Sequence, residues 1–127
     1  EARLGLLPAT IAPYVVRAMG GQAARRWFTT AERFSAAQGQ AMGFVHELCT
    51  PDEIDARVTA LVATLVANGP AAVRACKQLV RDVAGRPIDA ALRDETARRI
   101  ADIRASAEGR EGVSSFLNKR PPNWLAG

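Results

Sequence analysis

The sequence has few cysteine, histidine and aromatic residues, and these shortages exclude several classes of protein. Cys49 and Cys76 are the only cysteines, too few for a disulfide framework, and neither stands at a metal-ligand spacing from His46, the only histidine. No apolar run approaches the length of about 18 residues that suggests a membrane span. We therefore expect a soluble protein of a reducing cytoplasm, with no metal site and no membrane partner.

A one-sided positive surface is also lacking. Lys and Arg number 17 against 13 Asp and Glu, a formal net charge of +4. Nucleic-acid binders gather basic residues on one face and interleave aromatics, whereas acids are mixed in here, as in Arg93-Asp94-Glu95. A solvated, salt-bridged helix surface is the simpler interpretation, so we expect no nucleic-acid partner.

The chain opens on Glu1 rather than Met, and neither a charged leader nor a cleavage site precedes the first apolar residues. We expect that the natural start of the polypeptide is missing. With 127 residues and 48% hydrophobic content, the chain suffices for one modest core or a piece of one.

Helical signals are strong from Thr50 onward. Thr50 is the expected cap of a helix that begins at Pro51, and Glu53 completes a capping box. The helix then repeats apolar residues on one face: Ile54, Val58, Leu61, Val62, Leu65 and Val66.

Three further helices are predicted downstream. One begins at Pro70 and stops at Gly85, and the next begins at Pro87 and ends by Gly109. A short one is predicted within 110–120, because Pro121-Pro122 would terminate it.

Shorter elements are predicted upstream of Thr50. Helices are expected over 13–19, 22–30 and 36–42, the last capped by Ser35, and the alternation in Phe44-Val45-His46-Glu47-Leu48 predicts a brief strand. This inventory predicts a mainly α protein. Four other side chains receive structural interpretations: Cys76, Trp27 and Phe28 as packing residues, and Trp124 as a candidate for burial against a partner chain.

Five segments carry motifs in a fixed order. In Glu1–Pro8 a Glu precedes a small apolar run, Gly and Pro, and Arg17–Gly20 reads Arg-x-hydrophobic-Gly. Thr29–Ala36 is similar to "T-G-x-x-h-x-A", Ala41–Leu48 to "A-x-x-x-G-L-V-x-x-V", and Glu111–Arg120 to "E-G-x-x-A-F-x-E-K-R". Each motif alone is weak, but the ordered set resembles the enoyl-CoA hydratase/isomerase (crotonase) family and spans essentially the whole chain.

The resemblance implies a fold. The chain is expected to be the C-terminal helical half of a crotonase-like (ββα spiral) α/β fold, mainly α, with at most one or two short strands. Residues 1–49 would form the C-terminal end of the crotonase core, with the catalytic Glu loop, short helices and one strand. Residues 50–127 would form a helical region for trimerisation and CoA contact, which implies a homotrimer or hexamer.

The resemblance also implies an activity. Family members hold an acyl-CoA thioester carbonyl with two backbone N–H groups and stabilise an enolate-like charge, and hydratases add water to a 2-enoyl-CoA with two carboxylates. Glu1 matches the second of these carboxylates. The first Glu and the oxyanion hole would precede this chain, so the chain alone is expected to be an inactive lyase fragment. Coenzyme A is part of the substrate, and no separate cofactor is expected.

Phe116 and Lys119 match positions that approach the CoA nucleotide in the family. An aromatic face suits an adenine, and an ammonium suits a phosphate. The structural alternatives are that Phe116 belongs to the core and that Lys119 is merely solvated.

One departure from the family pattern affects specificity. Many members follow the Pro with a glycine-rich "G-x-G-G-T" entrance, whereas this chain has Pro8-Ala9-Thr10-Ile11-Ala12-Pro13-Tyr14-Val15. That variant resembles members that act on methylglutaconyl-CoA and related thioesters, and it leaves the acyl group open. Two other functions stay open: an enoyl-CoA isomerase that uses one carboxylate, and a non-catalytic helical oligomerisation module.

Overall fold

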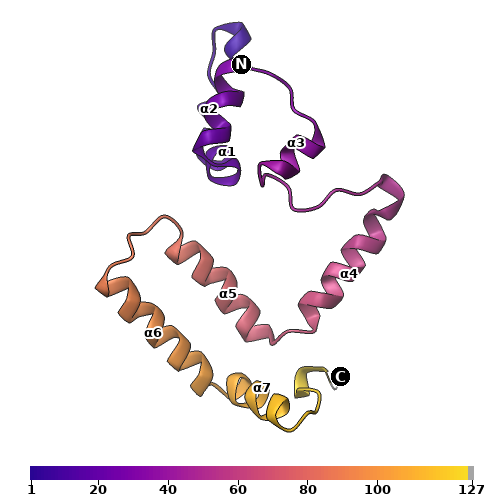
Figure 1. Ribbon diagram of the computed structural model, residues 1–127, viewed down its shortest axis with the longest axis vertical. Helices are drawn as coiled ribbons and strands as arrows, with labels where there is room; N and C mark the ends of the chain where they lie inside the picture. The colour runs from indigo at the N-terminus through magenta and orange to yellow at the C-terminus, as the bar shows by residue number, and fades with distance from the viewer. Residues whose placement is uncertain (126–127) are drawn as a thin grey trace. The chain divides into compact units, whose positions relative to one another are not determined.

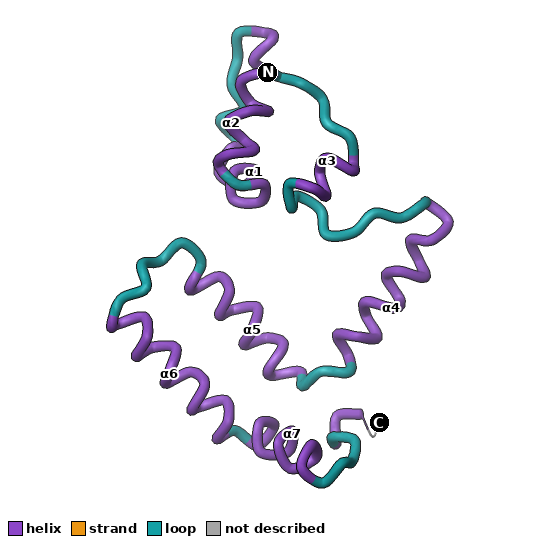
Figure 2. The backbone as a smooth tube through the Cα atoms, viewed as in Figure 1, coloured by secondary structure: helices purple, strands orange, loops and turns teal. Residues whose placement is uncertain are grey.

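The computed structural model describes residues 1–125, and it contains helices and loops but no strand within that range (Figure 1; Figure 2). This confirms the mainly α fold class. The chain divides into two compact units, Glu1–Ile54 and Asp55–Gly127.

The first unit begins with two helices that meet at a glycine corner. The 3-10 helix η1 (Ala2–Leu4) and the helix α1 (Ala12–Met19) both pack against α2 (Gly21–Thr30). Gly20 ends α1 and precedes α2 with φ 81 and ψ 153, a backbone conformation that side chains with a Cβ rarely adopt. Because the corner is tight, Met19 and Ala24 are buried on its two sides. The two helices predicted there are confirmed, each beginning one residue earlier than expected.

Three aromatic rings hold the rest of this unit together. The ring centroids of Trp27 and Phe34 lie 5.1 Å apart, and those of Phe34 and Phe44 lie 6.1 Å apart in an edge-on arrangement. The Arg26 guanidinium lies 4.8 Å from the centroid of the Trp27 ring, a cation–π contact. Trp27 is therefore a packing residue, as the sequence indicated.

The helix α3 (Ala36–Ala41) has the cap that the sequence predicts. The Ser35 hydroxyl accepts the backbone N–H of Gln38 at 3.2 Å, and the Gln38 side chain accepts the backbone N–H of Ser35 at 2.8 Å. This reciprocal pair is a capping box, which satisfies two backbone donors at the start of the helix.

The strand predicted at 44–48 is wrong. The backbone N–H groups of Phe44 and Val45 both donate to the Gly39 carbonyl, and the Gln40 side chain donates to the His46 carbonyl at 3.2 Å. A strand needs a neighbouring strand to receive its backbone hydrogen bonds. Here the end of α3 receives them instead, so the segment forms turns and bends.

The helix α4 (Ile54–Val66) follows a 3-10 turn, η2 (Pro51–Glu53). The backbone N–H and the hydroxyl of Thr50 donate to the Glu53 carboxylate at 2.9 and 2.8 Å, so the predicted helix start is confirmed. No residue of α4 is buried within the described chain. Its apolar stripe is 48–64% exposed: Ile54, Val58, Leu61, Val62, Leu65 and Val66.

The second unit continues with α5 (Pro70–Val83), α6 (Ala90–Ala105), α7 (Ala107–Leu117) and a terminal 3-10 turn, η3 (Asn123–Leu125). Both α5 and α6 pack against α7. No single helix among residues 1–125 is long and apolar enough to cross a bilayer, although the bent pair Pro51–Val66 and Pro70–Val83 passes that test together.

Two helix boundaries differ from prediction because a polar side chain caps each helix elsewhere. The predicted start at Pro87 is wrong: Asp89 adopts an extended backbone and its carboxylate accepts the N–H of Leu92 at 2.8 Å, so α6 begins at Ala90. The Ser106 hydroxyl accepts the N–H of Gly109 at 3.0 Å, so α7 begins before Gly109 rather than after it.

The core interpretation of Cys76 is also wrong, because its side chain is exposed. Cys76 lies on α5, and no residue of that helix is buried within the described chain. An apolar stripe at helical spacing becomes a core only where another element covers it.

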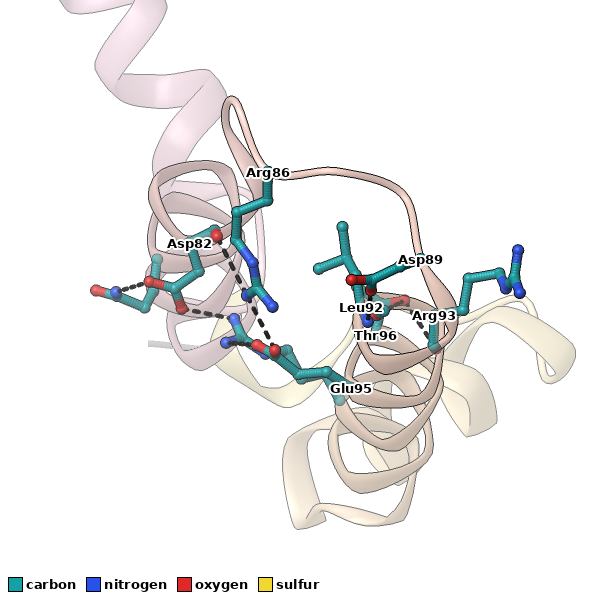
Figure 3. A network of polar contacts seen from close by, with 9 residues as sticks. Asp82, Arg86, Asp89, Leu92, Arg93, Glu95 and Thr96 are labelled. Atoms are coloured by element: carbon teal, nitrogen blue, oxygen red, sulfur yellow. Dashed lines mark hydrogen bonds and ion pairs between the residues drawn. The ribbon is translucent and has the colours of Figure 1, made fainter.

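Ion pairs connect α5 to α6, which run side by side (Figure 1; Figure 3). Arg99 contacts Asp82 at 2.7 Å and also contacts Glu95, while Arg86 contacts Glu95 at 2.9 Å. The hydrogen bond from Arg99 lowers the pKa of Asp82, and the hydrogen bond from Arg86 lowers the pKa of Glu95. This network fixes the α5–α6 pair, in which Leu92 is the buried apolar side chain of α6.

Candidate functional site

Glu1 lies at the start of a tight turn in the first unit. Its carbonyl accepts the backbone N–H groups of Leu4 at 2.8 Å and Leu6 at 3.2 Å, and Gly5 completes the turn with φ 71. The turn packs against α2, so the backbone of Glu1 is held in place. The side chain is exposed and makes no hydrogen bond or ion pair with residues 1–125.

Three leucines that belong to this turn or follow it are exposed. Leu4, Leu6 and Leu7 are 78%, 62% and 73% exposed. The same short segment therefore carries an exposed carboxylate and exposed apolar side chains, a proton-transfer group and groups suited to contact a hydrocarbon chain. The segment that replaces the glycine-rich entrance leads into α1, on which Tyr14 is exposed.

Phe116 and Lys119 lie at the end of α7 in the second unit. Phe116 is 81% exposed, which excludes the interpretation that it belongs to this chain's core. Lys119 is exposed, and its ammonium has no hydrogen bond or ion pair within the described part of the chain. Both side chains are available to a ligand or to another chain.

The end of α7 is a Schellman motif. The N–H of Arg120 donates to the Ser115 carbonyl at 3.0 Å, and the N–H of Lys119 donates to the Phe116 carbonyl at 3.2 Å. In this motif the residue after the helix cap adopts a left-handed backbone and is usually glycine. Lys119 occupies that position with φ 51, so a charged side chain stands where glycine would be less strained.

A bidentate ion pair encloses this turn. Arg120 Nη1 and Nη2 donate to the two carboxylate oxygens of Glu111 at 2.6 and 2.8 Å, and the backbone N–H of Asn123 donates to the same carboxylate at 2.9 Å. The hydrogen bond from Arg120 lowers the pKa of Glu111 to about 2. We call this pair, Glu111 with Arg120, the α7 clamp. Both residues lie in the closing motif, but their spacing of nine residues does not predict that they pair.

Trp124 fastens the segment that follows the clamp. Its indole Nε1 donates to the Ala67 carbonyl at 3.2 Å, just beyond the end of α4. A Cβ on Gly112 would lie 3.2 Å from the Trp124 ring, so glycine permits the ring to approach α7. The ring is thus half-buried against its own chain.

Glu108 makes a second contact that no motif in the sequence predicts. Its carboxylate accepts the backbone N–H groups of Ala71 at 2.9 Å and Ala72 at 2.8 Å, at the N-terminus of α5. Negative charge at a helix N-terminus is favourable. Gly69 is buried beneath it, since a Cβ there would lie 2.5 Å from the carboxylate. This contact joins α7 to α5.

A shallow hollow of about 340 Å³ lies over the α6–α7 corner. It is lined by Arg104, Arg110, Val113, Ser114, Leu117 and Asn118. Two guanidinium groups thus stand beside the turn that carries Phe116 and Lys119. No group of three or more His, Cys, Asp or Glu side chains suited to a metal ion lies within residues 1–125.

The order and packing of these helices match solved structures of crotonase-type proteins. An enoyl-CoA hydratase from Shewanella pealeana aligns with a TM-score of 0.86 and 42% identity over 98% of this chain and 46% of its own. Pseudomonas aeruginosa AtuE aligns with a TM-score of 0.85 and 38% identity over 98% of this chain and 48% of its own. The fold is therefore the helical half of that architecture.

The family model for enoyl-CoA hydratase/isomerase matches residues 1–126, and the chain belongs to this family of enzymes. The 2,3-dehydroadipyl-CoA hydratase of Escherichia coli is 29% identical over 126 residues, which cover 98% of this chain and 49% of that protein. The chain spans about half the length of the curated relatives that it matches.

Proposed function

We propose that the protein containing this chain is an enoyl-CoA hydratase, which adds water across the C2–C3 double bond of a 2-enoyl-CoA. Membership of the enoyl-CoA hydratase/isomerase family and the hydratase activity for which its relatives are named support this proposal. The observation that carries the role of Glu1 is its placement: a carboxylate without a partner in residues 1–125, on a fixed turn beside exposed leucines.

The proposed reaction uses two carboxylates. One carboxylate accepts a proton from water as the water oxygen bonds to C3, and negative charge moves onto the thioester oxygen, where backbone N–H groups stabilise it. Glu1, in its acid form, gives a proton to C2 as the enolate collapses. The first carboxylate and the oxyanion hole belong to the part of the family fold that is outside this chain. No separate cofactor enters this scheme, because coenzyme A is part of the substrate.

The proposed CoA contacts are Phe116 for the adenine and Lys119 for a phosphate. The exposure of the Phe116 ring and the unpaired ammonium of Lys119 within residues 1–125 support this assignment. Arg104 and Arg110 in the neighbouring hollow add positive charge that favours an anionic nucleotide. Residues 50–127 would also supply the contacts of a homotrimer or hexamer.

The test is a Glu1→Gln substitution in the full-length polypeptide that carries this sequence. We expect kcat for crotonyl-CoA or methylglutaconyl-CoA to fall by about 100-fold or more with little change in KM, since general acid–base catalysis contributes that much. Glu47→Gln, an exposed carboxylate of the same unit, is the matched control and should leave kcat unchanged.

A fall in kcat of less than about tenfold would contradict the role of Glu1. Conversion of a 3-enoyl-CoA to a 2-enoyl-CoA without hydration would assign the isomerase activity of the family instead. A wild-type protein that does neither would leave a helical oligomerisation module.

A further inference from the structure

Lys119 is held by contacts on both sides of it in the sequence. Before it, the Asn118 side chain donates to the Ser114 carbonyl at 2.8 Å. After it, Arg120 is paired with Glu111, and Glu111 also accepts the N–H of Asn123. The ammonium of Lys119 is left unpaired within the described residues, so these contacts fix its backbone and leave its charge free.

The backbone conformation at this position also requires support. Lys119 has φ 51, which a residue with a Cβ adopts only when its surroundings determine it. The two Schellman hydrogen bonds and the α7 clamp provide this support. Without the clamp, the turn would be free to relax toward an ordinary helix end, and Lys119 would change direction relative to Phe116, which lies on α7 itself.

We infer that the α7 clamp is a positioning device, which orients Lys119, beside Phe116 at the end of α7, toward the nucleotide part of a CoA thioester. This inference rests on the proposed function, in which those two side chains contact the nucleotide. Glu111 and Arg120 touch no substrate in this scheme. They act by holding the turn, which lowers the conformational entropy lost when the nucleotide binds.

The test compares two substrates of the full-length polypeptide, crotonyl-CoA and crotonyl-pantetheine, which lacks the nucleotide. Arg120→Met should raise KM for crotonyl-CoA by about tenfold, the effect of losing one charge-assisted contact, with kcat unchanged. KM for crotonyl-pantetheine should stay the same. Arg86→Met, which breaks the ion pair between the loop after α5 and Glu95 of α6, is the control and should alter the KM of neither substrate.

Two further variants separate positioning from general damage. The double variant Glu111→Arg with Arg120→Glu should bring KM for crotonyl-CoA back close to the wild-type value, because the ion pair is restored with its charges exchanged. In a Lys119→Met background, Arg120→Met should raise KM by much less than it does alone, since both changes act on one contact.

The outcomes are distinguishable. A wild-type protein that hydrates neither substrate contradicts the proposed function. If the wild-type protein hydrates both substrates, the positioning role can be tested by itself. That role is overturned if Arg120→Met leaves KM unchanged, or if it raises KM equally for the two substrates.

Discussion

Two residues that carry a Cβ, Ala31 and Lys119, have a left-handed backbone, which is strained for such residues. Ala31 follows α2 with φ 51, and its N–H donates to the Trp27 carbonyl at 3.2 Å. In the motif "T-G-x-x-h-x-A", glycine stands at the position that Ala31 occupies in this chain. The structure gives the reason, because a left-handed helix end favours a residue without a Cβ.

Replacing Ala31 by glycine should therefore stabilise the protein. We expect Ala31→Gly to raise the free energy of unfolding by about 1 kcal/mol, because relief of the left-handed strain exceeds the added freedom of the unfolded chain. Urea denaturation followed by circular dichroism measures it. Ala37→Gly, inside α3, is the matched control and should lower the free energy by about 1 kcal/mol. Equal losses for both would contradict the strain argument.

At the scale of elements, polar side chains join the helices of the second unit. Glu108 joins α7 to α5, and the Asp82–Arg99 pair joins α5 to α6. The Arg86–Glu95 pair joins the loop after α5 to α6, and Trp124 joins the C-terminal segment to the end of α4. Contacts between helices that depend on ionised carboxylates should contribute less to stability in acid. The α7 clamp is the clearest example.

The clamp should lose its contribution to stability between about pH 4.5 and pH 2. The pKa of Glu111 is about 2 in the folded chain, below the value of about 4.3 expected for an unfolded glutamate. Between about pH 4.5 and pH 2 the unfolded chain therefore binds more protons than the folded chain does. The contribution of the clamp to the free energy of unfolding is fully present above this pH range, and it is lost as the pH falls through the range. Chemical denaturation at several pH values measures this.

The matched variant is Glu111→Gln, which cannot titrate. The difference in free energy of unfolding between the wild type and this variant should be constant above about pH 5 and shrink toward pH 2. A difference that stays constant over the whole range would show that Glu111 is not held by Arg120.

At the scale of the whole molecule, the exposed apolar stripe of α4 predicts association. Burial of such a surface contributes about 25 cal/mol per Å², and contiguous apolar patches on single chains mark interaction sites. We expect this chain to form oligomers at micromolar concentration, measured by light scattering. A monomeric mass under those conditions would contradict the prediction.

A double substitution tests whether the apolar stripe of α4 forms the contact between chains. Val58→Asp with Leu65→Asp, in the middle of the stripe, should lower the mass toward that of the monomer. Tyr14→Ser removes an exposed aromatic from the first unit and should leave the mass unchanged.

The sequence by itself determined the helices and two of their caps, because capping by Thr50 and Ser35 involves residues only three positions apart. It also indicated the family, through motifs in order. The predictions of a strand at 44–48 and of a core position for Cys76 were wrong, since a strand and a buried side chain both depend on a neighbour elsewhere in the chain. Only the tertiary structure showed that Glu108 caps α5 and that Glu111 holds Arg120. Sequence spacing does not fix which faces of two helices meet, and that meeting decides which charges become partners.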